Sequence, residues 1–158
     1  MSNRRIILIA AVAQNNVIGK RGVTPWHIPE ELALFKELTM GHTLLVGKNT
    51  YESIGHALPG RAMVILSTTL SSQAANGSIV CRSIPEALER TKNESTLFVI
   101  GGAQVYAQMM PLADELAISH LDQAYEGDAA FPPIDQHIWK ITETRTFPLF
   151  THNRYVRI

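Results

Sequence analysis

A buried strand, a pair of glycines and a helix follow one another in the segment TLFVIGGAQVYAQMM, Thr96–Met110. Thr96–Ile100 is a short apolar run with branched side chains, which is typical of a strand buried on both faces of a sheet. Ala103–Met110 carries apolar side chains at helical spacing, and Pro111 ends it because proline cannot continue a helix. A strand followed directly by a helix is the unit of parallel sheets, so this segment indicates an α/β fold.

The alternation of strands and helices continues along the chain. Short apolar runs predict further strands at Ile6–Ala13, Thr43–Val46, Ala62–Leu66, Ser78–Val80 and Glu115–His120. Helical patterns fall between them at Pro29–Thr39, Thr50–Ile54 and Ile84–Thr91. No helix separates the last two predicted strands, Ile138–Thr146 and His152–Ile158, which favours an antiparallel hairpin. We therefore predict one domain over residues 1–158: a twisted, mostly parallel central sheet, helices on both faces and this hairpin at the edge.

The overall composition excludes several classes of protein. A chain of 158 residues with 46% hydrophobic and 18% charged residues suits one globular domain. Its 14 basic and 14 acidic side chains cancel, so no basic excess favours nucleic acid or a membrane surface. The apolar run near the N-terminus is too short for a signal peptide or a membrane span. The single cysteine, Cys81, is expected to be buried and inert. One cysteine cannot form an internal disulfide, which suits the reducing cytoplasm. We expect a monomer.

Polar or glycine-containing segments follow four of the predicted strands, at the edge where parallel sheets bind ligands. They are Asn15–Gly22, Gly47–Thr50, Ser67–Thr69 and Gly101–Gly102. Gly47–Thr50 combines a glycine, a lysine and a helix start, which suits an anion but equally suits a capped strand-to-helix turn. The glycine pair allows backbone to approach a phosphate or a ring closely. The glycine, lysine and hydroxyl spacing of a Walker P-loop is absent. Two partial phosphate sites on one sheet favour an extended dinucleotide over a nucleoside triphosphate as the ligand.

Two adjacent carboxylates open the helix predicted over Pro29–Thr39, in the segment WHIPEELALFK. The helix dipole favours acidic residues there, so surface charge alone could explain them. Glu31 and Phe35, however, lie one turn apart on one face, where an apolar neighbour raises the pKa of a carboxyl group by desolvation. We interpret Glu31 as a functional acid and Glu30 as solvent-facing, on a helix expected to bury Leu32.

Arg61 follows a turn at Pro59 and Gly60 and is a second candidate binding residue. Its planar guanidinium suits a ligand carboxylate, although most single arginines after a turn are simply solvated. The six histidines show no metal-ligand spacing, so no metal is predicted. No serine stands in a nucleophile elbow.

These features, in this order along nearly the whole chain, resemble the dihydrofolate reductase family. No single motif decides the resemblance, but the ordered set is specific. The matching motifs are Ile9–Ala11, Val17–Gly19, Thr24–Trp26, Pro29–Leu32, Phe35–Lys36, Gly47–Gly55, Leu58–Arg61, Ile65–Ser67, Val99–Gly102, Val105–Tyr106 and Glu126–Asp128.

The resemblance implies a reaction, since the family reduces dihydrofolate to tetrahydrofolate with NADPH. Glu31 would hold the amino group and ring nitrogen of the pterin and favour its protonation, directly or through a water. Ser119 stands where the family has a hydroxyl bonded to that acid. Trp26 and the loop Asn15–Thr24 would form a mobile lid, and Arg61 would bind the glutamate carboxylate of the substrate. The rings of substrate and cofactor would be lined by Ile9, Ala11, Leu32, Phe35, Ile54, Leu58, Ile100 and Tyr106.

The cofactor half of the site is also implied by the resemblance. The bond between Gly101 and Gly102 is expected to be cis, as in the family. The residues expected to contact NADPH are Ala10, Ile18, Gly19, Gly47, Lys48, Asn49, Thr50, Leu66, Ser67, Thr68, Arg82, Gly101, Gly102, Gln104 and Val105.

The chain departs from the usual bacterial pattern at several of these positions. The pocket acid is commonly Asp in bacteria, and the extra methylene of Glu31 moves the carboxylate. We therefore expect weaker binding of antifolate inhibitors of the diaminopyrimidine class, such as trimethoprim. Lys48 replaces a more frequent arginine, and Ala103 and Gln104 stand where many relatives have glycine and arginine.

Two other functions fit parts of the pattern. One is a reductase of another pterin-like or flavin-precursor ring, which would need neither an acid at position 31 nor a carboxylate-binding arginine. The other is a non-catalytic NADPH-binding module, which would bind the cofactor without oxidising it when dihydrofolate is added.

Overall fold

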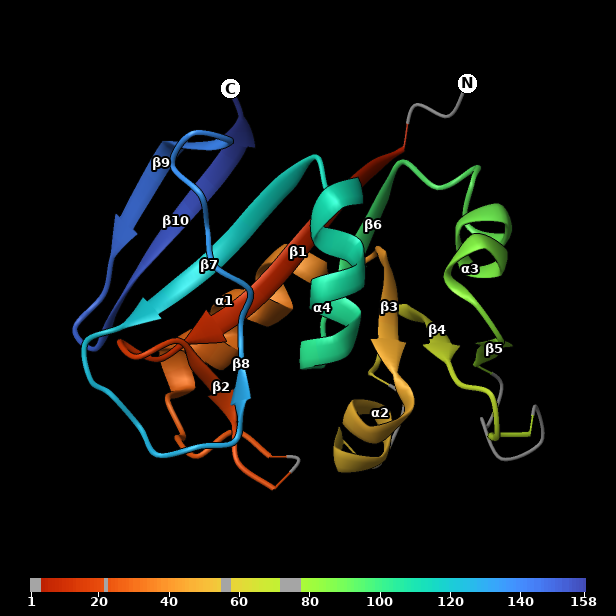
Figure 1. The fold of residues 1–158 in the computed structure, drawn as a ribbon, viewed down its shortest axis with the longest axis horizontal. Coiled ribbons are helices and arrows are strands. Elements are labelled where there is room, and N and C mark those ends of the chain that lie inside the picture. The colour runs from red at the N-terminus through yellow and green to blue at the C-terminus, as the bar shows by residue number, and fades with distance from the viewer. Residues whose placement is uncertain (1–3, 22, 55–57, 72–77) are drawn as a thin grey trace.

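The computed structural model describes residues 4–21, 23–54, 58–71 and 78–158. Its centre is an eight-stranded sheet in the order β5-β4-β3-β6-β1-β7-β10-β9 (Figure 1). The strands from β5 to β7 in this order are parallel, whereas β10 is antiparallel to both β7 and β9. The bounds are β1 Arg5–Val12, β3 Thr43–Gly47, β4 Ala62–Leu66, β5 Ile79–Cys81, β6 Thr96–Val99, β7 Glu115–Leu121, β9 Trp139–Thr146 and β10 Phe150–Arg157.

Helices cover both faces of this sheet. Side chains of α1 (Pro29–Thr39) and α2 (Lys48–Ile54) pack on one face, in a cluster with Ile7 and Ile9 of β1. Side chains of α3 (Ile84–Arg90) and α4 (Ala103–Met109) pack on the other, with Leu8 and Ala10 of the same strand. Successive strand residues point to opposite faces, which explains why these strands are apolar without interruption. The predicted α/β architecture with its antiparallel edge hairpin is confirmed.

Most predicted elements are found within two residues of their expected bounds. A short 3₁₀ helix, Met110–Leu112, follows α4 at the proline that was expected to end the helix. Cys81 lies in β5 and is fully buried, as predicted. Within the described ranges, no helix is both long and apolar enough to cross a membrane.

The segment after β1, which we expected to be a polar loop, contains a strand. β2 (Val17–Gly19) pairs in antiparallel fashion with β8 (Ala129–Ala130) in a small separate sheet. The N–H of Asp128 donates to the carbonyl of Gly19 at 3.0 Å beside this pair. Strands of two or three residues have no periodic pattern of their own, so only the pairing between distant segments reveals them.

The buried side of α1 also differs from the prediction. Leu32 is 52% exposed, whereas Leu34 is 5% exposed and packs in a cluster with Leu121 and Phe150. The helix therefore turns Leu34 towards β7 and β10. Leu32 is left at the rim of the cavity described below.

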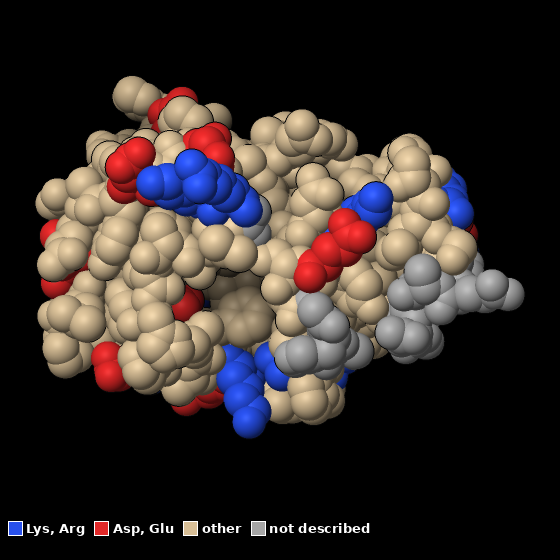
Figure 2. All heavy atoms as spheres, turned by 90° about the horizontal axis from the view of Figure 1, so that it is seen from below, with Lys and Arg blue, Asp and Glu red and all other residues tan. Residues whose placement is uncertain are grey.

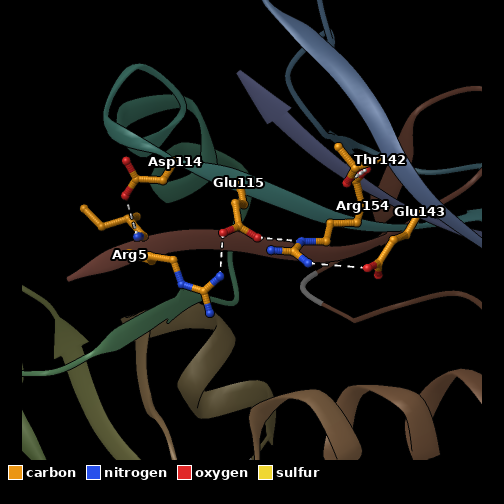
Figure 3. A network of polar contacts seen from close by, with 7 residues as sticks. Arg5, Asp114, Glu115, Thr142, Glu143 and Arg154 are labelled. Atoms are coloured by element: carbon orange, nitrogen blue, oxygen red, sulfur yellow. Dashed lines mark hydrogen bonds and ion pairs between the residues drawn. The ribbon is translucent and has the colours of Figure 1, made fainter. Parts of the chain in front are cut away.

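A polar cluster ties the strands together at the edge where β1 and β7 begin. The side chain of Glu115, the first residue of β7, is 9% exposed. One of its oxygens accepts from Arg5 Nη1 and the other from Arg154 Nε, both at 2.7 Å (Figure 3). Arg154 also lies 3.6 Å from Glu143 of β9. The carboxylate thus links β1, β7 and β10.

Candidate active site

A cavity of about 1380 Å³ opens at the carboxyl ends of β1, β3, β4 and β6. Figure 2 views the molecule from this side and shows the hollow, with acidic and basic side chains near its rim. In parallel sheets, backbone amides are free at this edge, and ligands bind where neighbouring connections diverge. The strands β6 and β1 are neighbours in the sheet. The chain leaves β1 towards β3, on one side of this pair, and leaves β6 towards β7, on the other side, so the two connections diverge here.

Glycines bring the ends of β3 and β6 close together on one wall of the cavity. The N–H of Gly47 donates to the carbonyl of Gly101 at 2.8 Å, and the Gly101–Gly102 peptide bond is cis, as predicted. A Cβ on Gly102 would lie 3.0 Å from the Thr50 Oγ1, and one on Gly47 would lie 3.1 Å from the Val105 side chain. This wall is therefore bare backbone, which a flat or anionic group can approach.

Glu31 stands in the first turn of α1 and lines the cavity together with Phe35. The residue is half-buried, and no described residue forms a hydrogen bond or ion pair with its carboxyl group. Burial raises the pKa of Glu31 from 4.5 to about 7. Glu30, its neighbour, is exposed, as predicted. One carboxyl group of this pair can therefore exchange a proton near neutral pH.

Tyr106 of α4 closes the cavity near this acid. Its hydroxyl donates to the carbonyl of Ile9 at 2.7 Å, and the residue is buried. Burial, and secondly the charge of Glu31, raise the pKa of Tyr106. The phenol therefore stays protonated and acts as a fixed wall.

Arg61 lines the same cavity, as does Lys36 of α1. The Arg61 Nε donates to the carbonyl of Pro59 at 3.1 Å, and the Arg61 Nη1 donates to Thr39 Oγ1 at 3.2 Å. These two bonds hold the guanidinium in place and leave further N–H groups for a ligand, because arginine has five donors. Arg61 is thus a positioned cation.

A rigid turn at the end of β4 forms another part of the rim. The Ser67 hydroxyl accepts the N–H groups of Thr69 at 3.1 Å and Leu70 at 2.9 Å. The guanidinium of Arg82 donates to the Ser67 carbonyl at 3.0 Å. Ser83 then caps α3 by accepting the N–H of Glu86.

The segment after β1 is tied to the segment after β7. Trp26 lines the cavity, and its ring lies 5.1 Å from that of Tyr125. The Asn15 amide donates to the Tyr125 carbonyl at 2.9 Å and accepts the Tyr125 N–H at 3.2 Å. Lys20 pairs with Glu126 at 3.3 Å. These contacts hold the wall that includes Trp26.

All but one of the predicted site residues line this single cavity. The exception is Ser119, whose expected bond to Glu31 is absent from the structure. Its hydroxyl lies instead 2.9 Å from Nδ1 of His152, because antiparallel pairing of β7 with β10 places the two residues side by side. The role predicted for Ser119 at the pocket acid stays a prediction.

Sequence reasoning missed several residues of the cavity wall. Most adjoin predicted residues along the chain and could have been found by extending each motif. Ala129 had no local signal, because it reaches the cavity only through the β2–β8 pairing. The missed residues are His27, Ile28, Lys36, Ser53, Ser83, Ile84, Pro85, Ala103, Gln108 and Ala129.

Comparison with known proteins identifies the family. The sequence profile of dihydrofolate reductase matches residues 5–157. The chain belongs to the dihydrofolate reductase family. It is 42% identical over 140 residues to dihydrofolate reductase of Neisseria meningitidis serogroup A, covering 88% of this chain and 86% of that relative. It is 40% identical over 150 residues to dihydrofolate reductase type 3 of Salmonella typhimurium, covering 95% and 92%.

A solved structure agrees with this assignment. Dihydrofolate reductase from Enterococcus faecalis, in complex with NADP(H) and RAB-propyl, superimposes with a TM-score of 0.89. The sequences are 31% identical, and the match covers 97% of this chain and 96% of the other. The predicted enzyme class, an NADPH-dependent oxidoreductase of this family, is confirmed.

Proposed function

We propose that the protein reduces 7,8-dihydrofolate to tetrahydrofolate and that Glu31 is its catalytic acid. The observation that carries this proposal is a half-buried carboxyl group without a described partner, whose pKa is raised to about 7 inside the family's cavity. An acid poised near the working pH is best placed to favour protonation of the bound ring. Such a reaction supports one-carbon and thymidylate metabolism.

The cofactor half of the cavity fits NADPH. The bare backbone of Gly47, Gly101 and Gly102 would accept a flat ring or a phosphate, and Lys48 and Arg82, which line the same cavity, supply positive charge. When bound, NADPH supplies the hydride of the reaction. The chain's own contribution is to hold donor and acceptor carbons about 3–3.5 Å apart.

The substrate half would be formed by Glu31, the apolar wall and Arg61. Phe35, Ile54 and Leu58 would hold the rings, and Arg61 would bind the glutamate carboxylate through a bidentate contact. Trp26 and the segment around β2 would exclude water, which strengthens the interaction between Glu31 and the protonated ring.

We propose weaker inhibition by trimethoprim than an enzyme with Asp as the pocket acid would show. Glu31 carries one more methylene than Asp, so its oxygens stand further from the α1 backbone. The inhibition constant of the wild-type protein should therefore exceed that of the Glu31→Asp variant. Equal constants would contradict this part of the proposal.

An assay of NADPH oxidation tests the main proposal. Absorbance of the nicotinamide band should fall on addition of dihydrofolate, and Glu31→Gln should abolish most of that fall at neutral pH while NADPH still binds. Glu30→Gln is the matched control, because it neutralises the exposed neighbour, and it should leave turnover unchanged. Oxidation with other pterin-like rings but not with dihydrofolate would favour the alternative reductase, and binding without oxidation would favour a cofactor-binding module.

We also propose that residues 1–158 act as one domain and as a cytoplasmic monomer. Support for one domain is that the central sheet draws strands from residues 5 to 157. Support for a reducing compartment is the single, fully buried thiol of Cys81.

A further inference from the structure

The last residue of α1 is a fully buried threonine that contacts the cation of the cavity. The Thr39 Oγ1 donates to the carbonyl of Phe35 at 2.7 Å and accepts from the Arg61 Nη1 at 3.2 Å. A carbonyl group can only accept and a guanidinium can only donate, so these two partners fix the direction of both bonds. The hydroxyl group of Thr39 therefore gives its one proton to the helix and turns a lone pair towards Arg61.

The turn that carries Arg61 is packed against the same end of α1. The N–H of Gly41, just after the helix, donates to the carbonyl of Gly60 at 2.9 Å. A Cβ on Gly60 would overlap the sulfur of Met40, so the backbone of the turn and this side chain are in direct contact. The end of α1 thus fixes the backbone beside Arg61, and Thr39 fixes the far end of the arginine side chain.

These contacts leave one edge of the Arg61 guanidinium open. The Nε is bonded to the carbonyl of Pro59, and one N–H of Nη1 is bonded to Thr39. The remaining N–H groups lie on Nη1 and Nη2, and two parallel N–H groups match the two oxygens of a carboxylate. Because Arg61 lines the cavity, a ligand carboxylate would meet it end-on, in the direction that Pro59 and Thr39 set.

α1 also spaces this cation from the acid of the cavity. Glu31, Phe35 and Thr39 follow one another at intervals of four residues, so they lie along one side of the helix. Glu31 and Phe35 line the cavity directly, whereas Thr39 reaches it through Arg61. Eight residues of α-helix span about 12 Å. The helix therefore sets the distance between a ring held at Glu31 and a carboxylate held at Arg61.

The end of α3 repeats the arrangement away from the cavity. Thr91, the C-cap residue of α3, is 2% exposed, and its hydroxyl group donates to the carbonyl of Ala87 at 2.8 Å. It accepts from the Nη1 of Arg4 at 2.9 Å. None of these three residues lines the cavity. Both threonines thus join a helix end to an arginine, but only the arginine bonded to Thr39 faces a ligand.

We propose that Thr39 is a positioning residue for substrate recognition, which holds the open edge of Arg61 towards the cavity and so favours substrates with a carboxylate beyond their rings. This inference rests on the proposed function, which brings such a carboxylate to Arg61. Without the hydroxyl group, Nη1 would lose its acceptor and the guanidinium would turn towards water. Substrate binding would then have to order the arginine side chain, which lowers affinity.

Steady-state kinetics with two substrates test the role of Thr39. Thr39→Val keeps the branched shape and loses the hydroxyl group, and it should raise the KM for dihydrofolate about 10-fold, the effect of one hydrogen bond. The kcat should stay near the wild-type value, because Glu31 is untouched. For 6-methyl-7,8-dihydropterin, which has the ring but no carboxylate, kcat/KM should not change. Thr39→Ser keeps the hydroxyl group and should restore the wild-type KM for dihydrofolate.

Two further variants separate this role from a merely structural one. Thr91→Val is the matched control, because it removes the same two kinds of bond at α3, and it should leave the KM for dihydrofolate unchanged. In an Arg61→Ala background, Thr39→Val should raise the KM no further, since the group through which it acts is gone. An unchanged KM in Thr39→Val, an equal rise in Thr91→Val, an equal effect on both substrates or a rise that persists without Arg61 would overturn the proposal.

A measurement on the wild-type protein covers the case in which Thr39→Val does not fold. Nitrogen-15 NMR of the Arg61 side chain at pH 7 should resolve Nη1 from Nη2, because bonds to Thr39 and Pro59 hinder rotation of the guanidinium. One averaged signal would mean that the group turns freely, and the proposal would be wrong. Failure of the wild-type protein to oxidise NADPH with dihydrofolate would instead contradict the proposed function, and the NMR result would still decide whether Arg61 is held.

Discussion

Glu31, half-buried beside the cavity, and Glu115, buried at the opposite ends of the strands, are two glutamates that differ in their partners. Glu115 receives a charged donor on each oxygen, from Arg5 and Arg154, both at 2.7 Å. Glu31 has no described partner, and burial raises its pKa to about 7. The paired carboxylate is bound by fixed charge and ties strands together. The unpaired one has a raised pKa and can gain or lose a proton near neutral pH.

The contrast shows why the second arrangement belongs at a ligand site. A buried carboxyl group without a partner destabilises the folded state when it is charged, because desolvation disfavours the charge. A protein keeps such a group where a ligand will supply the missing partner. Pairing at Glu115 relieves the same penalty inside the protein itself.

Turnover should separate the two residues by the widest margin. Glu31→Gln removes the acid and should lower kcat by about 100-fold to 10,000-fold at pH 7. Glu115→Gln should retain near-normal kcat, because the Glu115 cluster lies where β1 and β7 begin, at the ends opposite the cavity. Steady-state kinetics of both variants make the comparison, and a comparable loss in both would show that burial alone, not the missing partner, defines the acid.

Glu31→Gln, which should lower turnover, should raise the stability of the folded protein above neutral pH. The folded-state pKa of about 7 lies above the ordinary value of 4.5, so the folded state binds more protons between these values. Stability should therefore fall as pH rises from 4.5 to 7, by up to about 3 kcal/mol. Glu31→Gln should recover that amount at pH 8 and nothing at pH 4. Denaturant unfolding at both pH values measures it, and a variant less stable at pH 8 would contradict the account.

Loss of charge at Glu115 should destabilise the protein. Glu115→Gln leaves two arginines without their shared carboxylate. Because their side chains are 52% and 38% exposed, water compensates in part, and we expect a loss of about 2 kcal/mol. The midpoint of urea unfolding at pH 7 reports this loss. An unchanged midpoint would mean that the charge of Glu115 does not stabilise the folded protein.

An exposed ion pair should give the smallest change in the free energy of unfolding among these variants. Glu89 and Lys92 lie 2.6 Å apart on the surface, with side chains 70% and 55% exposed. Glu89→Gln should change the free energy of unfolding by less than about 0.5 kcal/mol, since water screens exposed charges. A larger loss than that of Glu115→Gln would show that burial does not decide the strength of these pairs.

Local patterns were sufficient to predict the layers of the fold, its ligand-binding edge and the acid Glu31, whereas most individual cavity residues came from the family resemblance. The run from Thr96 to Ile100 and the helix that follows it indicate a parallel βα unit without knowledge of any other segment. The face shared by Glu31 and Phe35 follows from helix geometry alone. These predictions succeeded because their causes act within about ten residues of the chain.

Contacts between distant segments decided the remainder. The β2–β8 pairing joins residues about 110 positions apart, and α1 buries Leu34 instead of Leu32 because β7 and β10 present Leu121 and Phe150. The partner of Ser119 is His152, although no local pattern links the two. Such choices depend on which strands become neighbours.

By itself, then, the sequence determined an α/β sheet with a ligand edge and an acid at the start of a helix, since apolar spacing and helix ends are local properties. Only the tertiary structure decided which acid is left without a partner and which is held by two arginines. Arg5 and Arg154 stand 110 and 39 residues from Glu115 in the chain. A charge finds its partner through space, and the order of the strands sets which charges meet.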